Sequence, residues 1–189
     1  MAVRIYGNRK IETLPGEATR PTSSRVREAL FNIWQGKILD CRWLDLCAGS
    51  GAMGAEALCR GAASATAIEK SGAACRLIKA NWQKVAKPNQ HIEVIQGDVL
   101  RQVKHLAKQI ESKTQPAFDC IYFDPPYAAG LYSAVLEQIA NCTSDRAQIA
   151  VEYSEKLWKP HRLNRLEVVK EKRYGSTQLL FLTPKESQS

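Results

Sequence analysis

The sequence lacks the features that mark several large classes of protein. It has no apolar run long enough to span a bilayer and no signal segment at its start, so we expect a cytoplasmic protein that does not enter a membrane. Its six cysteines form no C-x-x-C pair, and its three histidines, His91, His105 and His161, stand apart. This scatter argues against a zinc site or a thioredoxin-like motif. We therefore expect chemistry that needs neither a metal nor a covalent nucleophile.

Negative charge is scarcer than positive charge. The chain has 27 lysines and arginines against 19 aspartates and glutamates, which gives a net charge of +8 over 189 residues. This balance favours an anionic partner, and nucleic acid first. Basic side chains gather in an N-terminal segment and again over 156–173. The N-terminal group consists of Arg4, Arg9, Lys10, Arg20, Arg25 and Arg27.

Short apolar strands alternate with segments of helical periodicity, over a length that suits one domain. This alternation predicts a mostly parallel sheet with helices on both faces. Two late strands between 166 and 182 have no full helix between them, which predicts an antiparallel terminal hairpin. Turn signals at Gly7-Asn8 and Pro15-Gly16 predict a short N-terminal appendage. The other expected strands are 43–44, 65–68, 92–95, 118–123 and 148–153, and the expected helices are 24–34, 52–60, 72–85, 100–110 and 131–141.

The tetrapeptide Asp124-Pro125-Pro126-Tyr127 directly follows the apolar run 118–123. Two consecutive prolines cannot donate to a sheet, so the strand must end there in a stiff, extended turn. The turn sets a carboxylate and a free carbonyl beside an aromatic ring. Such a turn suits a flat molecule with an amino group, because the oxygens accept from the amine and the ring stacks on the base. An ordinary turn remains the alternative for this motif alone.

A second motif, Asp45-Leu46-Cys47-Ala48-Gly49-Ser50-Gly51, predicts the end of a strand, a glycine-rich turn and the start of a helix. Glycines allow a positive φ and a close approach by a ligand. With Gly54 the stretch spells G-x-G-x-x-G, a dinucleotide fingerprint that is weak on its own. The next two predicted strands end at Glu69 and at Gly97-Asp98. Acidic residues and glycines thus follow successive strands at the edge where open α/β sheets bind ligands.

The carboxylates of this edge decide between candidate ligands. NAD would account for the glycines and Glu69, but not for Asp45, Asp98 or the proline turn. A P-loop is excluded because no Gly-Lys-Ser/Thr follows the glycines. S-adenosyl-L-methionine fits better, since it lacks phosphate, carries a sulfonium and an ammonium, and offers ribose hydroxyls and an adenine amine to carboxylates.

Together these motifs resemble class I S-adenosylmethionine-dependent methyltransferases and, more narrowly, the RsmD family, over nearly the whole chain. The resemblance also includes Arg4-Ile5-Tyr6-Gly7, the Arg-Pro-Thr helix segment over 19–32, and Tyr174-Gly175. This combination is far more specific than any single part. It implies an enzyme that methylates the exocyclic N2 of a guanine in small-subunit ribosomal RNA, on a Rossmann-like, seven-stranded sheet. The N-terminal appendage is shorter than the glycine- and arginine-rich form typical of the family.

The resemblance also implies roles for individual residues. Asp124 and the carbonyl of Pro125 would accept from the guanine amine, and Tyr127 would stack on the flipped base. Asp45, Gly49 and Gly51 would form the cradle around the methionine part of the donor. Glu69 would accept from the ribose hydroxyls, and Asp98, or the backbone beside it, would meet the adenine. The full expected set is Asp124, Pro125, Pro126 and Tyr127 for catalysis, Asp45, Ala48, Gly49, Gly51, Glu69, Lys70, Asp98 and Val99 for the donor, and Arg9, Lys10, Arg20, Arg25 and Arg27 for RNA.

We expect 1–21 to be a basic extension that docks RNA, 22–184 to be the catalytic domain, and 185–189 to be a frayed tail. The partner would be small-subunit ribosomal RNA, naked or within an assembling subunit, and the enzyme would be a monomer. Two rivals stay open: an adenine-N6 methyltransferase on DNA or RNA, and a non-enzymatic RNA-binding protein on the same fold. Single residues also have structural alternatives, with Asp45 capping a turn, Asp98 capping a helix and Tyr127 packing.

Overall fold

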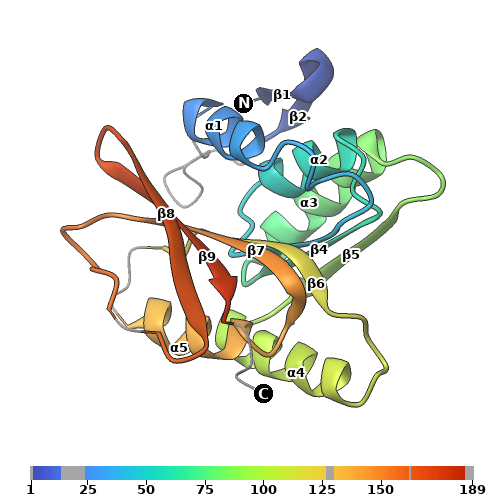
Figure 1. Cartoon of the computed structure of the whole chain (residues 1–189). Helices are drawn as coiled ribbons and strands as arrows, with labels where there is room; N and C mark the ends of the chain where they lie inside the picture. Colours follow the sequence, from blue (N-terminus) through green and yellow to red (C-terminus); the bar gives the residue numbers. More distant parts are fainter. Residues whose placement is uncertain (1, 14–23, 127–129, 162, 186–189) are drawn as a thin grey trace.

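The computed structural model describes residues 2–13, 24–126, 130–161 and 163–185 (Figure 1). Its centre is a seven-stranded sheet in the order β5-β4-β3-β6-β7-β9-β8, in which β9 is antiparallel to both neighbours. The strand order reverses between β3 and β6, so a ligand crevice is expected at their carboxyl ends. The strands are β3 (Arg42–Leu46), β4 (Ser64–Glu69), β5 (His91–Gln96), β6 (Phe118–Phe123), β7 (Thr143–Tyr153), β8 (Leu166–Tyr174) and β9 (Thr177–Pro184).

Helices cover both faces of the sheet (Figure 1). One face carries α1 (Ser24–Ile33), α2 (Ala52–Cys59) and α3 (Gly72–Val85), and the other carries α4 (Val99–Glu111) and α5 (Leu131–Ile139). Strand β3 is apolar at successive positions because both of its faces are covered. Trp43 packs into the α1–α3 layer, whereas Leu44 and Leu46 pack into the α4–α5 layer. The predicted fold class, including the terminal hairpin, is confirmed.

Most element boundaries agree with the sequence prediction, and β7 differs most. It begins at Thr143 instead of residue 148, because Thr143 pairs with Phe118 before the register shifts ahead of Cys120. The residues that follow Thr143 are polar, so an apolar pattern does not reveal that the backbone has already joined the sheet. Pairing through the backbone alone is a contact that periodicity cannot detect.

The N-terminal appendage is a two-stranded hairpin of β1 (Ala2–Ile5) and β2 (Arg9–Glu12), joined by the short helix η1 (Tyr6–Asn8). Gly7 and Asn8 both have positive φ, as the turn signal predicts. The hairpin stands apart from the main sheet and buries Ile5 and Ile11 in the cluster beneath α1–α3. The Pro15-Gly16 turn and the tail beyond 185 lie outside the described residues.

A buried asparagine fastens this hairpin to the glycine loop. Asn81, on α3, is fully buried. Its amide nitrogen donates to the carbonyl of Glu12 at 2.9 Å and to the carbonyl of Ser50 at 3.1 Å. Its oxygen accepts from the Glu12 N–H at 3.0 Å. The end of β2 and the predicted donor loop are therefore held by one side chain.

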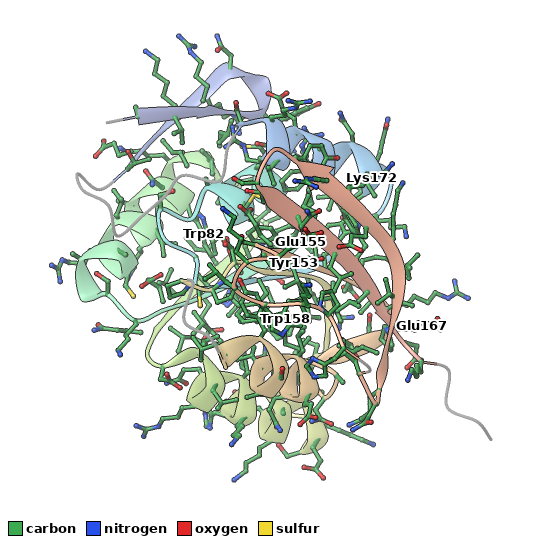
Figure 2. The ribbon with its side chains drawn as sticks, turned by 90° about the vertical axis from the view of Figure 1, so that its left-hand side faces the viewer. Trp82, Tyr153, Glu155, Trp158, Glu167 and Lys172 are labelled. Atoms are coloured by element: carbon green, nitrogen blue, oxygen red, sulfur yellow. The ribbon has the colours of Figure 1, made fainter. Side chains whose placement is uncertain are left out.

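Strand β8 forms an outer edge of the main sheet. Its side chains from Glu167 to Arg173 are exposed, whereas those of β9 are buried from Gln178 to Leu182. Figure 2 shows Glu167 and Lys172 along β8 on one side of the molecule. The second basic stretch of the sequence thus includes an edge strand, where charge also opposes pairing with other chains.

Candidate active site

Four parallel strands deliver the candidate active site at their carboxyl ends. Backbone bonds continue beyond the strands and hold these ends together. The Gly97 N–H donates to the carbonyl of Glu69 at 2.9 Å, which joins β5 to β4. The Asp124 N–H donates to the carbonyl of Leu46 at 3.4 Å, which joins β6 to β3. The proline turn and the glycine loop, far apart in sequence, therefore lie side by side.

Cys47 marks the centre of this edge. Burial is the largest cause that raises the pKa of its thiol, and the carboxylates of Glu69, Asp124, Asp45 and Asp98 raise the pKa further. The donor-side acids and the acid of the proline turn are thus close enough to act on one side chain. Cys47 also has a φ of 60°, which is uncommon for a residue other than glycine. Sequence reasoning missed this residue, because nothing in an apolar run signals left-handed backbone at a cysteine.

The glycine loop is shaped by α3 as much as by any ligand. Gly49 and Gly51 have positive φ values of 56° and 73°. The indole N–H of Trp82 donates to the Gly51 carbonyl at 2.8 Å. A Cβ at Gly54 would lie 2.2 Å from the Trp82 ring, and one at Gly51 would lie 2.9 Å from Ile78 and Trp82. Glycine is required here because the Trp82 side chain, labelled in Figure 2, closes on the loop.

Asp45 supports the loop from below and is buried. One carboxylate oxygen accepts from the N–H of Gly54 at 3.0 Å. Burial raises the pKa of Asp45 to about 8, against the lowering effect of that hydrogen bond. The structure thus shows Asp45 holding the loop that would face the donor, and its predicted place in the cradle around the methionine part stays a prediction. Its turn-capping alternative describes the observed contact.

Glu69 stands at the end of β4 and is half-buried. Its two oxygens accept from the N–H groups of Gly49 at 3.0 Å and Ser71 at 2.9 Å. These bonds fix the carboxylate between the glycine loop and the start of α3. A carboxylate oxygen has more than one acceptor site, so Glu69 keeps capacity for ribose hydroxyls.

Asp98 is the N-cap of α4, and its carboxylate accepts from the Arg101 N–H at 3.0 Å. It is exposed, which leaves its second oxygen accessible. Of the other expected donor residues, Ala48 is half-buried, Lys70 is exposed and Val99 is buried. Among the described residues, the ion pairs include none of the donor-side acids. Acidic groups without a basic partner suit a donor that carries two positive centres and no phosphate.

The proline turn continues directly from β6. Asp124 is half-buried, Pro125 is buried and Pro126 is exposed. Asp124 therefore sits at the boundary between the sheet and solvent, with its backbone held by β3. Tyr127 falls outside the described residues, so its stacking role stays a prediction.

Aromatic rings support the acceptor side of the site. Tyr132 of α5 stacks on Trp158 with ring centres 4.6 Å apart, and its edge meets Phe123 at 5.8 Å. Tyr153 meets Trp158 edge-on at 5.2 Å. Trp158, in the segment after β7, is thereby held between Tyr153 at the end of β7 and Tyr132 of α5; Figure 2 labels Tyr153 and Trp158. Side-chain stacking fixes this part of the edge.

The expected RNA contacts divide into accessible and buried residues. Arg9, Lys10 and Arg25 are exposed on the hairpin and α1. Arg20 falls outside the described residues. Arg27 is a correction, because its side chain is only 3% exposed and cannot reach a phosphate.

Arg27 instead joins the hairpin to two helices. Its guanidinium forms an ion pair with Glu56 of α2 at 2.6 Å and donates to the carbonyl of Arg4 at 2.5 Å. Glu56 is also paired with Arg60 at 2.9 Å. The signal was present in the sequence: Arg27 precedes the buried Phe31 by one helical turn, so both occupy the inward face of α1. A charge on that face needs a buried partner.

Within the described ranges, no group of three or more His, Cys, Asp and Glu side chains could hold a metal ion. In the same part of the chain, no helix is long and apolar enough to cross a membrane.

A family model described as "Conserved hypothetical protein 95" matches residues 3–183. The chain belongs to this family. Members of the family include RsmD-type ribosomal RNA methyltransferases, and the sequence resemblance is confirmed. The chain is 33% identical to "Ribosomal RNA small subunit methyltransferase D" of Escherichia coli K12, over 79% of this chain and 71% of the relative. It is 29% identical to "Putative rRNA methyltransferase YlbH" of Bacillus subtilis, over 89% and 90%.

A solved structure titled "Putative methyltransferase yhhF from Escherichia coli" superposes with a TM-score of 0.80 at 29% identity. The match covers 99% of this chain and 100% of that structure. The RsmD-type protein described here is thus a ribosomal RNA methyltransferase of the S-adenosyl-L-methionine-dependent class. Its glycine loop fits that donor, and so do the donor-side acids, which take part in none of the ion pairs found among the described residues.

Proposed function

We propose that this protein methylates the exocyclic N2 amine of a guanine in small-subunit ribosomal RNA. The observation that carries the proposal is the position of Asp124. This half-buried carboxylate directly follows β6, lies beside the glycine loop, and precedes the buried Pro125, whose carbonyl is a second hydrogen-bond acceptor. Such a pair of acceptors suits an aromatic amine.

The chemistry of an aromatic amine explains why acceptors are needed. Its lone pair is delocalised into the ring, so the nitrogen is a poor nucleophile. The Asp124 carboxylate and the Pro125 carbonyl would each accept one N–H, which favours a pyramidal nitrogen with its lone pair directed outward. Most of the acceleration would then come from orientation and fixed dipoles.

The donor side would hold S-adenosyl-L-methionine with Glu69 on the ribose, Asp98 near the adenine, and the Gly49–Gly51 loop along the methionine part. When bound, this molecule supplies an electrophilic methyl carbon on a sulfonium. Asp45 would hold the loop by its bond to Gly54. The backbone bond between β6 and β3 would set the distance between the two halves.

Residues 1–21 would form the RNA-docking extension and 22–184 the catalytic domain. The support is the exposed positive charge that Arg9 and Lys10 place on the hairpin and Arg25 places on α1. Arg27 is left out of this surface because it is buried.

Product mapping tests the proposal. The purified protein is incubated with labelled S-adenosyl-L-methionine and either naked small-subunit ribosomal RNA or assembled subunits from a strain that lacks the enzyme. We expect one N2-methylguanosine, located by digestion and mass spectrometry. N6-methyladenosine as the product would replace the proposal with the adenine rival, and binding of RNA without any transfer would favour a non-enzymatic role.

A further inference from the structure

Glu152 lies beside the proline turn, although no sequence motif includes it. It is the residue after Val151 on β7, and Val151 pairs with Phe123 on the parallel strand β6. The residue after Phe123, just beyond the end of β6, is Asp124. Neighbouring strands lie about 4.8 Å apart. Glu152 and Asp124 therefore occupy adjacent positions on adjacent strands, at the carboxyl edge of the sheet.

The side chain of Glu152 is directed by Tyr122. The Tyr122 hydroxyl donates to one Glu152 carboxylate oxygen at 2.5 Å. Tyr122 precedes Asp124 by two residues, and alternate residues of an extended chain share a face. Glu152 and Asp124 are thus on the same face of the sheet. The carbonyl of Glu152 also accepts from the Tyr132 hydroxyl at 3.3 Å, which holds its backbone.

Glu152 is a carboxylate in a place that disfavours charge. It is half-buried, and burial is the main cause that raises its pKa, against the Tyr122 bond. The ion pairs found within the described residues do not include it. Its second oxygen, which receives none of the hydrogen bonds just described, would be satisfied by a donor that arrives with the substrate.

Guanine and adenine differ in what they offer such an oxygen. Guanine presents N1–H and the N2 amine side by side, so the edge carries adjacent donors. Adenine presents an acceptor at N1 next to its amine, and a carboxylate would repel it. Enzymes that flip a base read its Watson–Crick edge by hydrogen bonds.

We propose that Glu152 determines base specificity by accepting the N1–H of the target guanine, while Asp124 and Pro125 accept from its N2 amine. Tyr122 is the positioning residue that aims the carboxylate. This inference rests on the proposed guanine-N2 activity and adds the residue that excludes other bases.

The test uses an RNA fragment whose target carries either guanine or 2-aminopurine. Both bases have the 2-amine, but 2-aminopurine has an acceptor at N1 in place of N1–H. Wild type should transfer far faster to guanine. The substitution Glu152→Gln supplies an N–H that suits the 2-aminopurine N1, so the guanine to 2-aminopurine ratio of kcat/KM should fall by about tenfold to a hundredfold.

Two controls separate specificity from damage to the fold. Glu155→Gln removes an exposed carboxylate three positions further along, at the site labelled in Figure 2, and should leave the ratio unchanged. Donor affinity by calorimetry should be equal in all variants. Tyr122→Phe keeps the Glu152 carboxylate but removes the hydroxyl that orients it. This variant should lower the guanine to 2-aminopurine ratio of kcat/KM less than Glu152→Gln does.

Two outcomes overturn the inference alone: an unchanged ratio in a folded Glu152→Gln variant, or wild type that uses both bases equally well. The comparison of the two bases with wild type needs no variant, so the inference can be rejected even if Glu152→Gln fails to fold. Wild type that transfers to neither 2-amine would reject the proposed function as well, and the two failures are thereby distinguished.

Discussion

The site has a donor half around the glycine loop, for the methyl donor, and an acceptor half around the proline turn, for the base that accepts the methyl group. The carboxylates of the two halves are held by different kinds of contact. On the donor side, Asp45, Glu69 and Asp98 each accept from backbone N–H groups. On the acceptor side as proposed above, the carboxylate of Glu152 accepts from a side chain, the hydroxyl of Tyr122. Aromatic stacking holds the segment behind it.

This difference decides which hydrogen bonds of the site a single amino-acid replacement can remove. A backbone N–H is present at every residue except proline, so the donor-side acids keep these partners when nearby side chains change. The glycine loop itself also depends on two side chains, those of Trp82 and Asn81. A side-chain partner disappears with a single replacement. With the role proposed for Glu152, a single replacement in the acceptor half would change which base is methylated.

The largest effect should come from the acceptor half. Asp124→Ala removes an acceptor for the reacting amine, and removal of one such aligned group typically lowers kcat by about 10²–10³-fold. Single-turnover transfer to RNA measures this loss. Donor affinity should remain near that of wild type, because the role proposed for Asp124 concerns the target base and not the donor. A variant with a near-normal transfer rate would separate Asp124 from the reaction.

Asp45→Asn should affect stability on the donor side in a pH-dependent way. Burial raises the pKa of Asp45 in the folded protein to about 8, so the protonated carboxyl makes its full contribution to stability at low pH. As pH rises from about 4 to 8, the unfolded carboxyl ionises while the folded one retains its proton, so wild type loses stability. Asparagine does not ionise, and the variant should gain a few kcal/mol relative to wild type across that window.

Urea unfolding without donor at pH 5 and pH 8 measures this difference. The exposed Asp145→Asn is the matched control and should show the same small difference at both values. If Asp45→Asn also shows no change with pH, the carboxyl is not kept protonated by burial.

Gly54→Ala should disturb the donor loop through packing. Its Cβ would lie 2.2 Å from the Trp82 ring, and overpacking of this kind costs about 1–3 kcal/mol. Gly72→Ala is the control, since its Cβ would meet the flexible Gln96 side chain at 3.1 Å. Thermal unfolding should separate the two variants. Equal unfolding temperatures would mean that Trp82 can move away without cost.

Much of the donor half could be predicted because its parts are close in sequence. Asp45 and its partner Gly54 belong to one motif, and Glu69 follows the next strand. The acceptor half depends on strand register, which places Glu152 next to Asp124 and is invisible to local patterns. The spacing of Arg27 to Phe31 indicated an inward position on α1, but the partner that makes its burial possible, Glu56, lies 29 residues away on another helix.

The smallest effect should come from the hairpin surface. Lys10→Ala should weaken RNA binding and reduce the slope of log affinity against log salt by roughly 0.7–0.9 if Lys10 contacts a phosphate. Lys104→Ala, an exposed site on α4 at the opposite layer, is the control with the same charge change. If the plots of log affinity against log salt have the same slope for both variants, RNA does not contact Lys10.

Asn81 bears on how this family diversifies. Its amide contacts backbone atoms of Glu12 and Ser50, so the bond is indifferent to which side chains those positions carry. The outer side chains of the hairpin can therefore change in evolution while the path of the chain is kept. With the RNA-docking role proposed for the hairpin, such changes would alter which RNA is bound. An insertion or deletion near Glu12 has no such freedom, because it would move the carbonyl away from an amide that is shared with the donor loop.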